Sequence, residues 1–508
     1  MPMFTTYDGT ELAYHIRGEG EPLVCLPGGP MRASAYLGDL GGLTAHRMLI
    51  LLDHRGTGDS GTPADPASYR CDRLVADVEA LRTHLGLDRM DLLGHSASGN
   101  LATLYAAAHP ARVRSLTLVT PGVRAVGIEV TDEEWDKAVE VHADQPWYPG
   151  IRAALDALPA DITMRALHEL VAPLAYGRWD EAAQAHAAAT GDEVNWDALE
   201  RYYGEGAFDP EATRAALAAV TAPVLVLAGA WDGGPTPARA AELAALFPQA
   251  ELAVQPGAGH YPWVDDPAAF ARTVAAFLDP EVSTVTVDGV RLAYRTWGEE
   301  DAPPLVLVHG RGGSGADWAP IARELAATRR VYALDLRGHG LSERPGRYGF
   351  DVFRDELGGF LTALGLTGAE VIGHSMGGAA ACLLAAREPG LIGRLVLEDA
   401  PVFFPLDPPR GPVPVPEGEP GFDWGVVVAT DAQLNAPDPG WRDDLTGLTT
   451  PTLLIGGGEN SHLPQEQLAW MAGQLPDGRL VTIETGHMIH ESEPDAFLSA
   501  VRDFGVGA

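Results

Sequence analysis

The sequence predicts an α/β protein made of two copies of one domain, each a mostly parallel β-sheet flanked by helices. The chain has 508 residues, which exceeds the size of one ordinary domain. Short Val-, Leu- and Ile-rich runs alternate with stretches of helical periodicity in both halves. One series of short segments also occurs twice in the same order.

The repeat consists of matching segments along the two halves. The pairs are "YDGTELAY" with "VDGVRLAY", "LILLDHRGTGDS" with "VYALDLRGHGLS", "DLLGHSASGN" with "EVIGHSMGGA", "PVLVLAGAWD" with "PTLLIGGGEN", and "PGAGHYPW" with "ETGHMIHE". Ser96 and Ser375 lie 279 positions apart, whereas His260 and His487 lie only 227 apart. The second copy is therefore shorter, and the missing part falls before the strand that begins near Pro223 in the first copy.

These spacings define two domains, residues 1–280 and 281–508. Almost no linker separates them, so we expect the two domains to touch rather than to swing freely. The first domain has a long insert at about 123–222, whose periodicity predicts a mostly helical cap. The second has a short lid at about 401–450. The stretch "PVFFPLDPPRGPVPVPEGEPGFDWG", with which this lid begins, is proline-rich and predicted to hold little helix.

The elements of each domain can be assigned in order. "DGTELAYHI" lies between turn signals and predicts an antiparallel hairpin at the sheet edge. The apolar runs predict buried parallel strands; in the first copy they are "PLVCL", "MLILLD", "MDLLG", "SLTLV" and "PVLVLAG". Stretches such as "CDRLVADVEALRTHLGL" have apolar residues at helical spacing and predict the helices between them.

Composition excludes several classes of function. The net charge is −35, which disfavours nucleic acid and anionic membranes as partners. No apolar run is long enough for a membrane span, and the N-terminus has no signal-peptide pattern. Three widely spaced cysteines fit neither a disulfide framework nor a metal cluster. We therefore expect a cytoplasmic protein that acts on a small molecule without a metal or organic cofactor.

The two Gly-His-Ser segments are the strongest functional signal. Ser96 and Ser375 each follow an apolar strand and precede an Ala-rich helix, and Gly373 and Gly377 complete a G-x-S-x-G pattern in the second copy. A serine on such a sharp strand-to-helix turn projects from the sheet, and small neighbours let the backbone pass. Both serines are therefore predicted nucleophiles.

A serine hydroxyl needs a base, and the base needs an orienting acid. In the first copy Asp232 follows "PVLVLAGAW" and His260 follows "LAVQPGAG", which gives the chain order serine, acid, histidine. His487, in "IETGH", is the equivalent base of the second copy. The other motif histidines, His54, His95, His339 and His374, are predicted to pack or hydrogen-bond within the turns.

The acid of the second copy is ambiguous. The position of Asp232 is occupied by Asn460, and the adjacent Glu459 is predicted to point in another direction. Asp399 follows the strand "RLVLE", where the first copy has Thr120, so we predict that Asp399 serves His487. The alternatives are that Glu459 is the acid, or that Asp399 only caps the lid.

An attacked carbonyl becomes an oxyanion, which requires preorganised N–H donors. The loop "LPGGP" and the residue after the nucleophile offer the N–H groups of Gly29 and Ala97. The loop "VHGRGG" and the second nucleophile turn offer those of Arg311 and Met376.

Together these motifs resemble an α/β-hydrolase in each half, and the resemblance covers nearly the whole chain. The first half resembles the proline iminopeptidase branch through "PGGP", "LDHRGTGDS" and its long insert, although Pro27 stands where that branch has histidine. The second half resembles small esterases, lactonases and carbon–carbon bond hydrolases. Some haloalkane dehalogenases carry their acid at the earlier strand, the position that Asp399 matches.

The sequence therefore predicts a serine hydrolase acting on an ester, thioester, lactone or amide bond of a small molecule. Two alternatives remain open: the second domain is a non-catalytic binding or scaffold partner, or the fold performs cyclase or lyase chemistry. The cap has more acidic than basic side chains. This excess either favours cationic substrates or only reflects helix faces that are exposed to solvent. Substrate identity and oligomeric state are not determined at this level.

Overall fold

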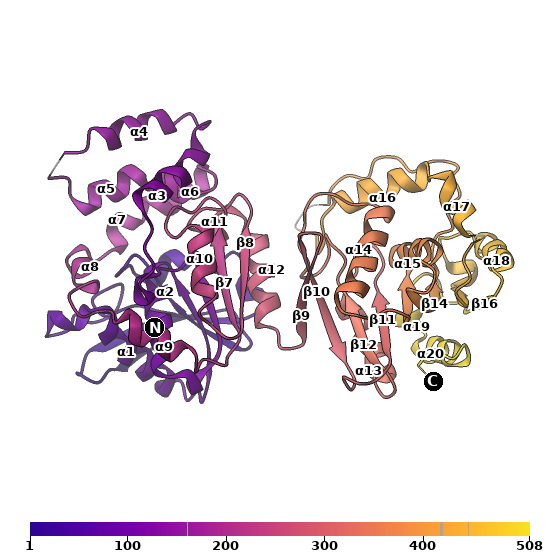
Figure 1. The fold of residues 1–508 in the computed structure, drawn as a ribbon, viewed down its shortest axis with the longest axis horizontal. Helices are drawn as coiled ribbons and strands as arrows, with labels where there is room; N and C mark the ends of the chain where they lie inside the picture. Colours follow the sequence, from indigo (N-terminus) through magenta and orange to yellow (C-terminus); the bar gives the residue numbers. More distant parts are fainter. Residues whose placement is uncertain (160, 417–419, 446, 508) are drawn as a thin grey trace. The chain divides into compact units, whose positions relative to one another are not determined.

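The computed structural model describes residues 1–159, 161–416, 420–445 and 447–507. The chain divides into two compact units, Met1–Leu278 and Asp279–Ala508, each with its own eight-stranded sheet (Figure 1). The predicted fold class, two tandem α/β domains with mostly parallel sheets, is confirmed.

The sheet of the first unit has the order β1-β2-β4-β3-β5-β6-β7-β8. Its strands are β1 (Met3–Thr5), β2 (Glu11–Arg17), β3 (Pro22–Leu26), β4 (Met48–Leu52), β5 (Met90–His95), β6 (Val113–Val119), β7 (Val224–Gly229) and β8 (Ala250–Gln255). β1 and β2 form the predicted antiparallel hairpin at the edge, and β3 to β8 are parallel.

The second sheet has the same topology, β9-β10-β12-β11-β13-β14-β15-β16. Its strands are β9 (Val282–Val287), β10 (Val290–Trp297), β11 (Pro304–Val308), β12 (Arg330–Leu334), β13 (Ala369–His374), β14 (Ile392–Glu398), β15 (Thr452–Gly456) and β16 (Gly478–Thr482). Each strand of one unit thus has a counterpart at the same place in the other. In both sheets the carboxyl ends of the parallel strands lie at one edge, where ligands bind in open α/β sheets.

Many helices of the first unit lie in a long insertion between β6 and β7. They are α1 (Cys71–His84), α2 (Ala97–Ala108), α3 (Asp132–Val139), α4 (Tyr148–Asp156), α5 (Met164–Val171), α6 (Glu181–Ala188), α7 (Thr190–Glu193), α8 (Trp196–Tyr202), α9 (Pro210–Leu217), α10 (Pro237–Ala244), α11 (Pro262–Asp265) and α12 (Pro267–Leu278). Helices α3 to α9 fall within the predicted cap. Side-chain caps start several of them: Thr131 and Glu134 form a complete capping box at α3.

The second unit has fewer helices. They are α13 (Ala319–Leu325), α14 (Phe350–Ala363), α15 (Ser375–Arg387), α16 (Gly425–Asn435), α17 (Pro439–Leu445), α18 (Gln465–Gln474), α19 (Ile489–Ser492) and α20 (Pro494–Asp503). The described part of the proline-rich stretch 401–424 contains no helix, as expected. The rest of the lid differs from the expectation, because α16 and α17 begin once the prolines become sparse.

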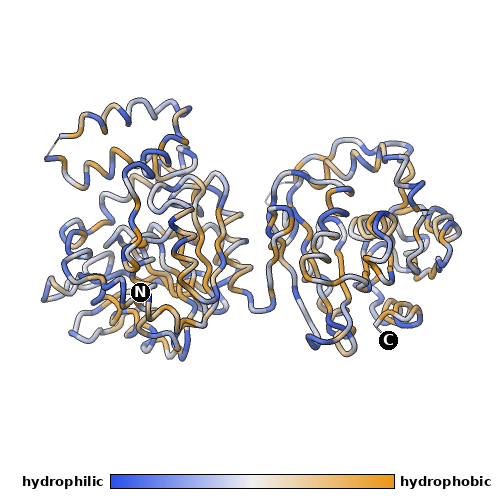
Figure 2. The backbone as a smooth tube through the Cα atoms, in the orientation of Figure 1, coloured by the Kyte–Doolittle hydropathy of each residue, from blue (hydrophilic) through white to orange (hydrophobic). Residues whose placement is uncertain are grey.

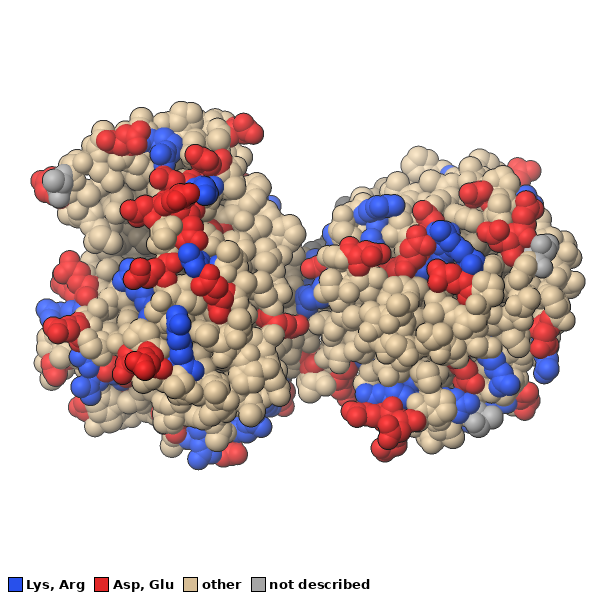
Figure 3. Space-filling model, in the orientation of Figure 1, with Lys and Arg blue, Asp and Glu red and all other residues tan. Residues whose placement is uncertain are grey.

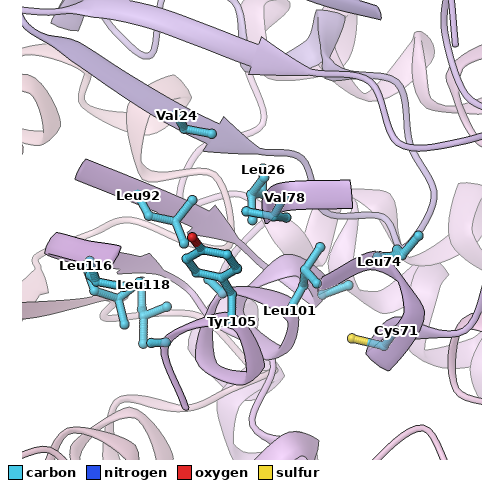
Figure 4. Packing of buried hydrophobic residues seen from close by; sticks show 14 of the residues in the cluster. Val24, Leu26, Cys71, Leu74, Val78, Leu92, Leu101, Tyr105, Leu116 and Leu118 are labelled. Carbon is cyan, nitrogen blue, oxygen red and sulfur yellow. The ribbon is translucent and has the colours of Figure 1, made fainter. Parts of the chain in front are cut away.

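Buried apolar side chains from strands and helices form the cores, in which the strands are the most hydrophobic segments (Figure 2). In the first unit, Leu92 and Leu116 of the sheet pack against Val78 of α1 and Leu101 of α2 (Figure 4). In the second unit, α14, α15, α17 and α18 cover one face of the sheet, and α13, α19 and α20 cover the other. This packing holds the carboxyl ends of the central strands rigidly in place.

Candidate active sites

Both predicted nucleophiles occupy a strained turn between a strand and a helix. Ser96 joins β5 to α2 with φ 53° and ψ −124°, and Ser375 follows β13 with φ 49°. A non-glycine residue in this region is uncommon and is typical of a nucleophile turn. The flanking glycines are sterically required: a Cβ on Gly94 or on Gly377 would lie 2.5 Å from a backbone oxygen.

The first unit joins its three predicted residues in one hydrogen-bonded series. His260 Nε2 lies 2.8 Å from Ser96 Oγ, and His260 Nδ1 lies 2.8 Å from Asp232 Oδ2. Asp232 is 4 % exposed. Burial disfavours the charged imidazolium, but the neighbouring Asp232 carboxylate outweighs that effect and raises the pKa of His260. This geometry allows proton transfer from the serine to the imidazole.

The backbone of His260 is held by side chains from the two central strands. Its carbonyl accepts hydrogen bonds from Thr120 Oγ1 and from His95 Nε2, each at 3.0 Å. His95 Nδ1 in turn accepts from the hydroxyl of Tyr36 at 2.6 Å, which fixes the tautomer. Burial, with a smaller effect of nearby His260, lowers the pKa of His95 well below its usual value, so this ring is neutral.

In the second unit Asp399 is the carboxylate next to the base. His487 Nδ1 lies 2.6 Å from Asp399 Oδ2, and the carboxylate is fully buried. It also accepts hydrogen bonds from Gly457 N, Ser461 Oγ and Gln465 Nε2. Burial alone would raise the pKa of Asp399, but these hydrogen bonds, with that of His487 first, lower it. Asp399 is therefore held as a carboxylate.

The alternative acid, Glu459, lies elsewhere. It is exposed, and its backbone N–H donates to the side chain of Glu484. Within the described residues neither Glu459 nor Asn460 makes a hydrogen bond to His487. Asp399 and Thr120 occupy equivalent positions. Asp399 follows β14, Thr120 follows its counterpart β6, and each residue has φ close to 40°. An acid at this point reaches the base as directly as one after β7.

Ser375 lines the same cavity as His487. Among the described residues, however, no hydrogen bond joins the two side chains, in contrast to the first unit. His374 Nε2 lies 3.0 Å from the carbonyl of His487, which matches the contact of His95 with His260. Burial lowers the pKa of His374 to about 4 and keeps this ring neutral. The role of His95 and His374 in holding the base was not anticipated, since each was expected to pack or hydrogen-bond within its own turn.

The predicted oxyanion donors lie at the cavities. Gly29 and Ala97 each line a cavity that Ser96 also lines, and Arg311 and Met376 line the cavity of Ser375. Ala97 begins α2 and Met376 is the second residue of α15, where N–H groups have no acceptor within the helix. These N–H groups are therefore available to a developing negative charge.

Two cavities meet Ser96 in the first unit. One, of about 270 Å³, also contains Asp232 and His260 and is walled by apolar and aromatic cap residues; these include Trp135, Val139, Val171, Leu174 and Tyr176. The other, of about 690 Å³, extends along the start of the cap and is lined by Arg124, Glu129, Tyr203 and Phe208, among others.

The acidic residues of the cap lie mainly on its surface. In Figure 3, several groups of red side chains lie on the surface of the upper part of the first unit, among tan ones. Among the described cap residues, Glu129 is the single acid that lines either cavity. This arrangement agrees with solvated helix faces rather than with an acidic lining for cationic substrates.

The cavity of the second unit, called the second cavity below, is smaller than either cavity of the first unit. It has a volume of about 220 Å³ and is lined by His309, Arg311, Ser375, Arg410, Thr430, His462 and His487, among others. Arg410, Thr430 and Leu434 come from the predicted lid. Neither Arg410 nor His462 was identified from the sequence, because their place at the cavity depends on the path of the lid and on the loop after β15.

One further cluster has the residue types of a metal site. Ligand atoms of His15, Asp53 and Asp59 lie within 4.8 Å of one another. Asp53 accepts hydrogen bonds from Ser34 and from the backbone of Asp59, so its carboxylate already ties the loop after β4 together. We assign this cluster a structural role.

No helix in the described parts of the chain is long and apolar enough to cross a membrane.

Comparison with known proteins agrees with the fold. The family model for the alpha/beta hydrolase fold matches residues 21–267 and 303–426, more than half of the chain. The 2-hydroxymuconate semialdehyde hydrolase of Pseudomonas sp. (strain CF600) is 43 % identical over 109 residues, which are 20 % of this chain and 38 % of that protein. The AB hydrolase superfamily protein YclE of Bacillus subtilis (strain 168) is 25 % identical over 277 residues, 54 % of this chain and 96 % of that protein.

Among solved structures, the enol-lactonase from Burkholderia xenovorans LB400 is similar, with 27 % identity and a TM-score of 0.41, over 55 % of this chain and 99 % of that one. The matched relatives thus correspond to single domains or parts of them. On the strength of the family match, the chain belongs to the alpha/beta hydrolase fold family.

Proposed function

We propose that each unit is a serine hydrolase that cleaves an ester, thioester, lactone or amide bond of a small molecule. The observation that carries this proposal is the series Ser96–His260–Asp232, in which both links are 2.8 Å hydrogen bonds. A nucleophile, a base and an orienting acid within hydrogen-bond reach are what acyl transfer requires.

In the proposed reaction, Ser96 Oγ attacks the substrate carbonyl carbon while His260 Nε2 takes the hydroxyl proton. The N–H groups of Gly29 and Ala97 stabilise the oxyanion. His260 then gives its proton to the leaving oxygen, sulfur or nitrogen, and an acyl-enzyme remains. A water molecule then gives a proton to His260 and attacks the acyl carbon. The bond to Ser96 Oγ breaks, His260 returns the proton to Ser96 Oγ, and the acid is released. Asp232 stabilises the imidazolium in both halves of the reaction.

The second unit follows the same scheme with Ser375, His487 and Asp399. One observation favours the alternative that it binds without turnover: Ser375 and His487 are not hydrogen-bonded. We favour catalysis, because such contacts are often loose without substrate and tighten in the reacting complex. The buried Asp399–His487 contact would serve no evident purpose in a binding domain.

The cavities support different substrates for the two units. Trp135, Val171 and Leu174 give the first unit an apolar wall, which fits an apolar acyl or alcohol group. The aminopeptidase activity implied by the proline iminopeptidase resemblance is the narrower form of this proposal. The 2-hydroxymuconate semialdehyde hydrolase among the similar proteins supports hydrolysis as the class of reaction.

Location and partners follow as further proposals. The cysteines Cys25, Cys71 and Cys382 are buried and unpaired, which a reducing compartment permits, and we place the activity in the cytoplasm. The strongly negative charge supports a small-molecule substrate over nucleic acid or membrane.

The proposal is tested by assaying the full chain and its Ser96→Ala and Ser375→Ala variants on esters, lactones and aminoacyl amides. Each activity should depend on one of the two serines. A hydrolytic activity that survives in the double variant would refute the assignment, and activity that depends on Ser96 alone would support a non-catalytic second unit.

A further inference from the structure

The second cavity contains a pair of arginines that share one carboxylate. Arg311 Nη1 and Arg410 Nη1 each lie 2.7 Å from the same oxygen, Asp431 Oδ1. Both arginines line the cavity of Ser375, and each side chain is 31 % exposed, whereas Asp431 is 11 % exposed. Two positive charges thus meet one negative charge, and the cluster carries a net charge of +1.

These arginines are held in place by separate elements. Arg311 is in the loop after β11, and its side chain also donates to Thr430 Oγ1 of α16. Arg410 is in the proline-rich part of the lid, and Asn435 binds its backbone twice: Arg410 N donates to Asn435 Oδ1, and Asn435 Nδ2 donates to Arg410 O. The reciprocal pair fixes the lid backbone at this point, so Arg410 is positioned rather than loosely tethered.

Within the described residues, Asp431 is the single carboxylate that forms an ion pair with Arg311 or Arg410. Asp317 is exposed, and its carboxylate binds the backbone N–H and hydroxyl of Ser314. The histidines His309, His374 and His462 have pKa values lowered by burial and are neutral. Asp399 is paired with His487. Buried Glu398 is paired with His490.

We propose that Arg311 and Arg410 form a carboxylate-binding subsite, so that the second unit takes small esters or lactones whose acyl part carries a free carboxylate. The planar guanidinium matches a carboxylate with two parallel hydrogen bonds. Within the described residues, the hydrogen bond of each arginine to Asp431 comes from Nη1, and neither Nε nor Nη2 bonds to Asp431. A cavity of about 220 Å³ accepts only a small molecule. This inference rests on the hydrolase function proposed for that unit and specifies its substrate class.

Binding is measured first, because it does not depend on turnover. The full chain with Ser96→Ala and Ser375→Ala is titrated calorimetrically with monomethyl glutarate and with the neutral methyl pentanoate. The anionic ester should bind with one site per chain and about tenfold more tightly than the neutral one, and Arg311→Gln or Arg410→Gln should each remove that preference. Arg387→Gln, an exposed arginine at the end of α15, is the matched control and should keep it.

Turnover is measured second, in the Ser96→Ala chain, with mono-p-nitrophenyl glutarate and p-nitrophenyl pentanoate. The ratio of kcat/KM for the anionic over the neutral ester should fall about tenfold in Arg410→Gln and rise in Asp431→Asn, since that change removes the competing carboxylate. A purely structural cluster would shift the ratio in the same direction in both variants, or in neither, and this outcome would overturn the subsite.

These measurements distinguish failure of the carboxylate-binding subsite from failure of catalysis by the second unit. Selective binding of monomethyl glutarate without any turnover by Ser375 would keep the subsite and refute catalysis by the second unit. Turnover by Ser375 with no preference for the anionic ester, unaffected by Arg410→Gln, would keep catalysis and refute the subsite.

Discussion

The two units build the same sheet but place the carboxylate beside the predicted base at the ends of different strands. In the first unit Asp232 follows β7, and in the second Asp399 follows β14, the counterpart of β6. Both reach Nδ1 of the equivalent histidine, at 2.8 Å and 2.6 Å. Neighbouring parallel strands end side by side, so either strand end can present a carboxylate to one imidazole. The fold therefore fixes the nucleophile and the base more strictly than the acid.

The two units also differ in which loop near the nucleophile turn supplies a buried histidine. In the first unit His54, after β4, lies 3.1 Å from Pro27 O and 3.0 Å from Ser98 Oγ. In the second unit the imidazole comes from the other loop: His309, the counterpart of Pro27, accepts from the N–H of Leu336, the counterpart of His54. One buried imidazole joins the two loops in each unit, and the strand that supplies it is interchangeable.

The surroundings of the base also differ. Next to His260, Tyr261 and Trp263 pack around His95. In the second unit His490 takes the place of Trp263 and forms a buried pair with Glu398. The first site is thus packed with aromatic rings, whereas the second has a buried hydrogen-bonded pair of a carboxylate and a histidine. Together with the arginines Arg311 and Arg410, this pair makes the surroundings of His487 more polar than those of His260.

The largest predicted effect is loss of the nucleophile. Ser96→Ala and Ser375→Ala should each lower the turnover of substrates of their own unit by about 10⁴–10⁶, because triad members act together. Steady-state kinetics on a substrate assigned to each unit measures this. Ser499→Ala, an exposed serine of α20, is the control. A loss of less than tenfold would remove that serine from the mechanism.

The acids should follow closely. Asp232→Asn in the first unit and Asp399→Asn in the second should each lower kcat by about 10⁴, because the imidazolium loses its stabilising charge. Glu459→Gln should have little effect, since Glu459 is exposed and apart from His487. A strong effect of Glu459→Gln with an active Asp399→Asn enzyme would reverse the assignment of the acid.

The pH profile of the first unit tests the raised pKa of His260. The base must be neutral in the free enzyme, so kcat/KM should fall about tenfold per pH unit below an apparent pKa that lies above the usual 6.5. Because Asp232 causes the increase, the residual activity of Asp232→Asn should have its midpoint at lower pH. An unchanged midpoint in Asp232→Asn would contradict this cause.

Moving the acid tests the equivalence of the two strand ends directly. Adding Thr120→Asp to Asp232→Asn places a carboxylate where the second unit has Asp399, on a backbone of the same φ. The double variant should be about tenfold or more faster than Asp232→Asn alone. Thr120→Asn in the same background is the control without charge. If Thr120→Asp restores no more activity to Asp232→Asn than Thr120→Asn does, a carboxylate after β6 cannot replace Asp232.

The smallest effect concerns the apolar wall of the first cavity. Each methylene added to a straight acyl chain should raise kcat/KM by about fourfold until the cavity is full, since burying a CH₂ contributes about 0.8 kcal/mol. Leu174→Ala should shift the preferred chain length upward. A preference for short chains that Leu174→Ala leaves unchanged would place the acyl group in the larger cavity near Tyr203.

Much of this architecture could be predicted from the sequence, because strand order and the nucleophile turn depend on local patterns. The periodicity predicts the strands, and the repeated Gly-His-Ser segments predict Ser96 and Ser375. The complementary placement of Asp399 and Thr120 was visible as well, since both end the same strand of the repeat. These features require only short-range sequence and the rule that parallel strands end at one edge.

What escaped prediction depends on contacts between distant segments. Arg410 reaches the second cavity because Asn435, far along the lid, binds its backbone. The helices α16 and α17 of the lid were missed because the prolines before them dominated the composition. The support that His95 and Thr120 give to His260 involves three separate strand ends, and no local pattern marks it.

The proposed function requires that one chain carries two independent serine nucleophiles. The direct measurement is intact-mass analysis of the full chain after reaction with a fluorophosphonate probe. The wild-type protein should gain two labels, Ser96→Ala and Ser375→Ala one each, and the double variant none. A single label on the wild-type chain, lost with one serine and indifferent to the other, would contradict the claim, as would labelling of the double variant.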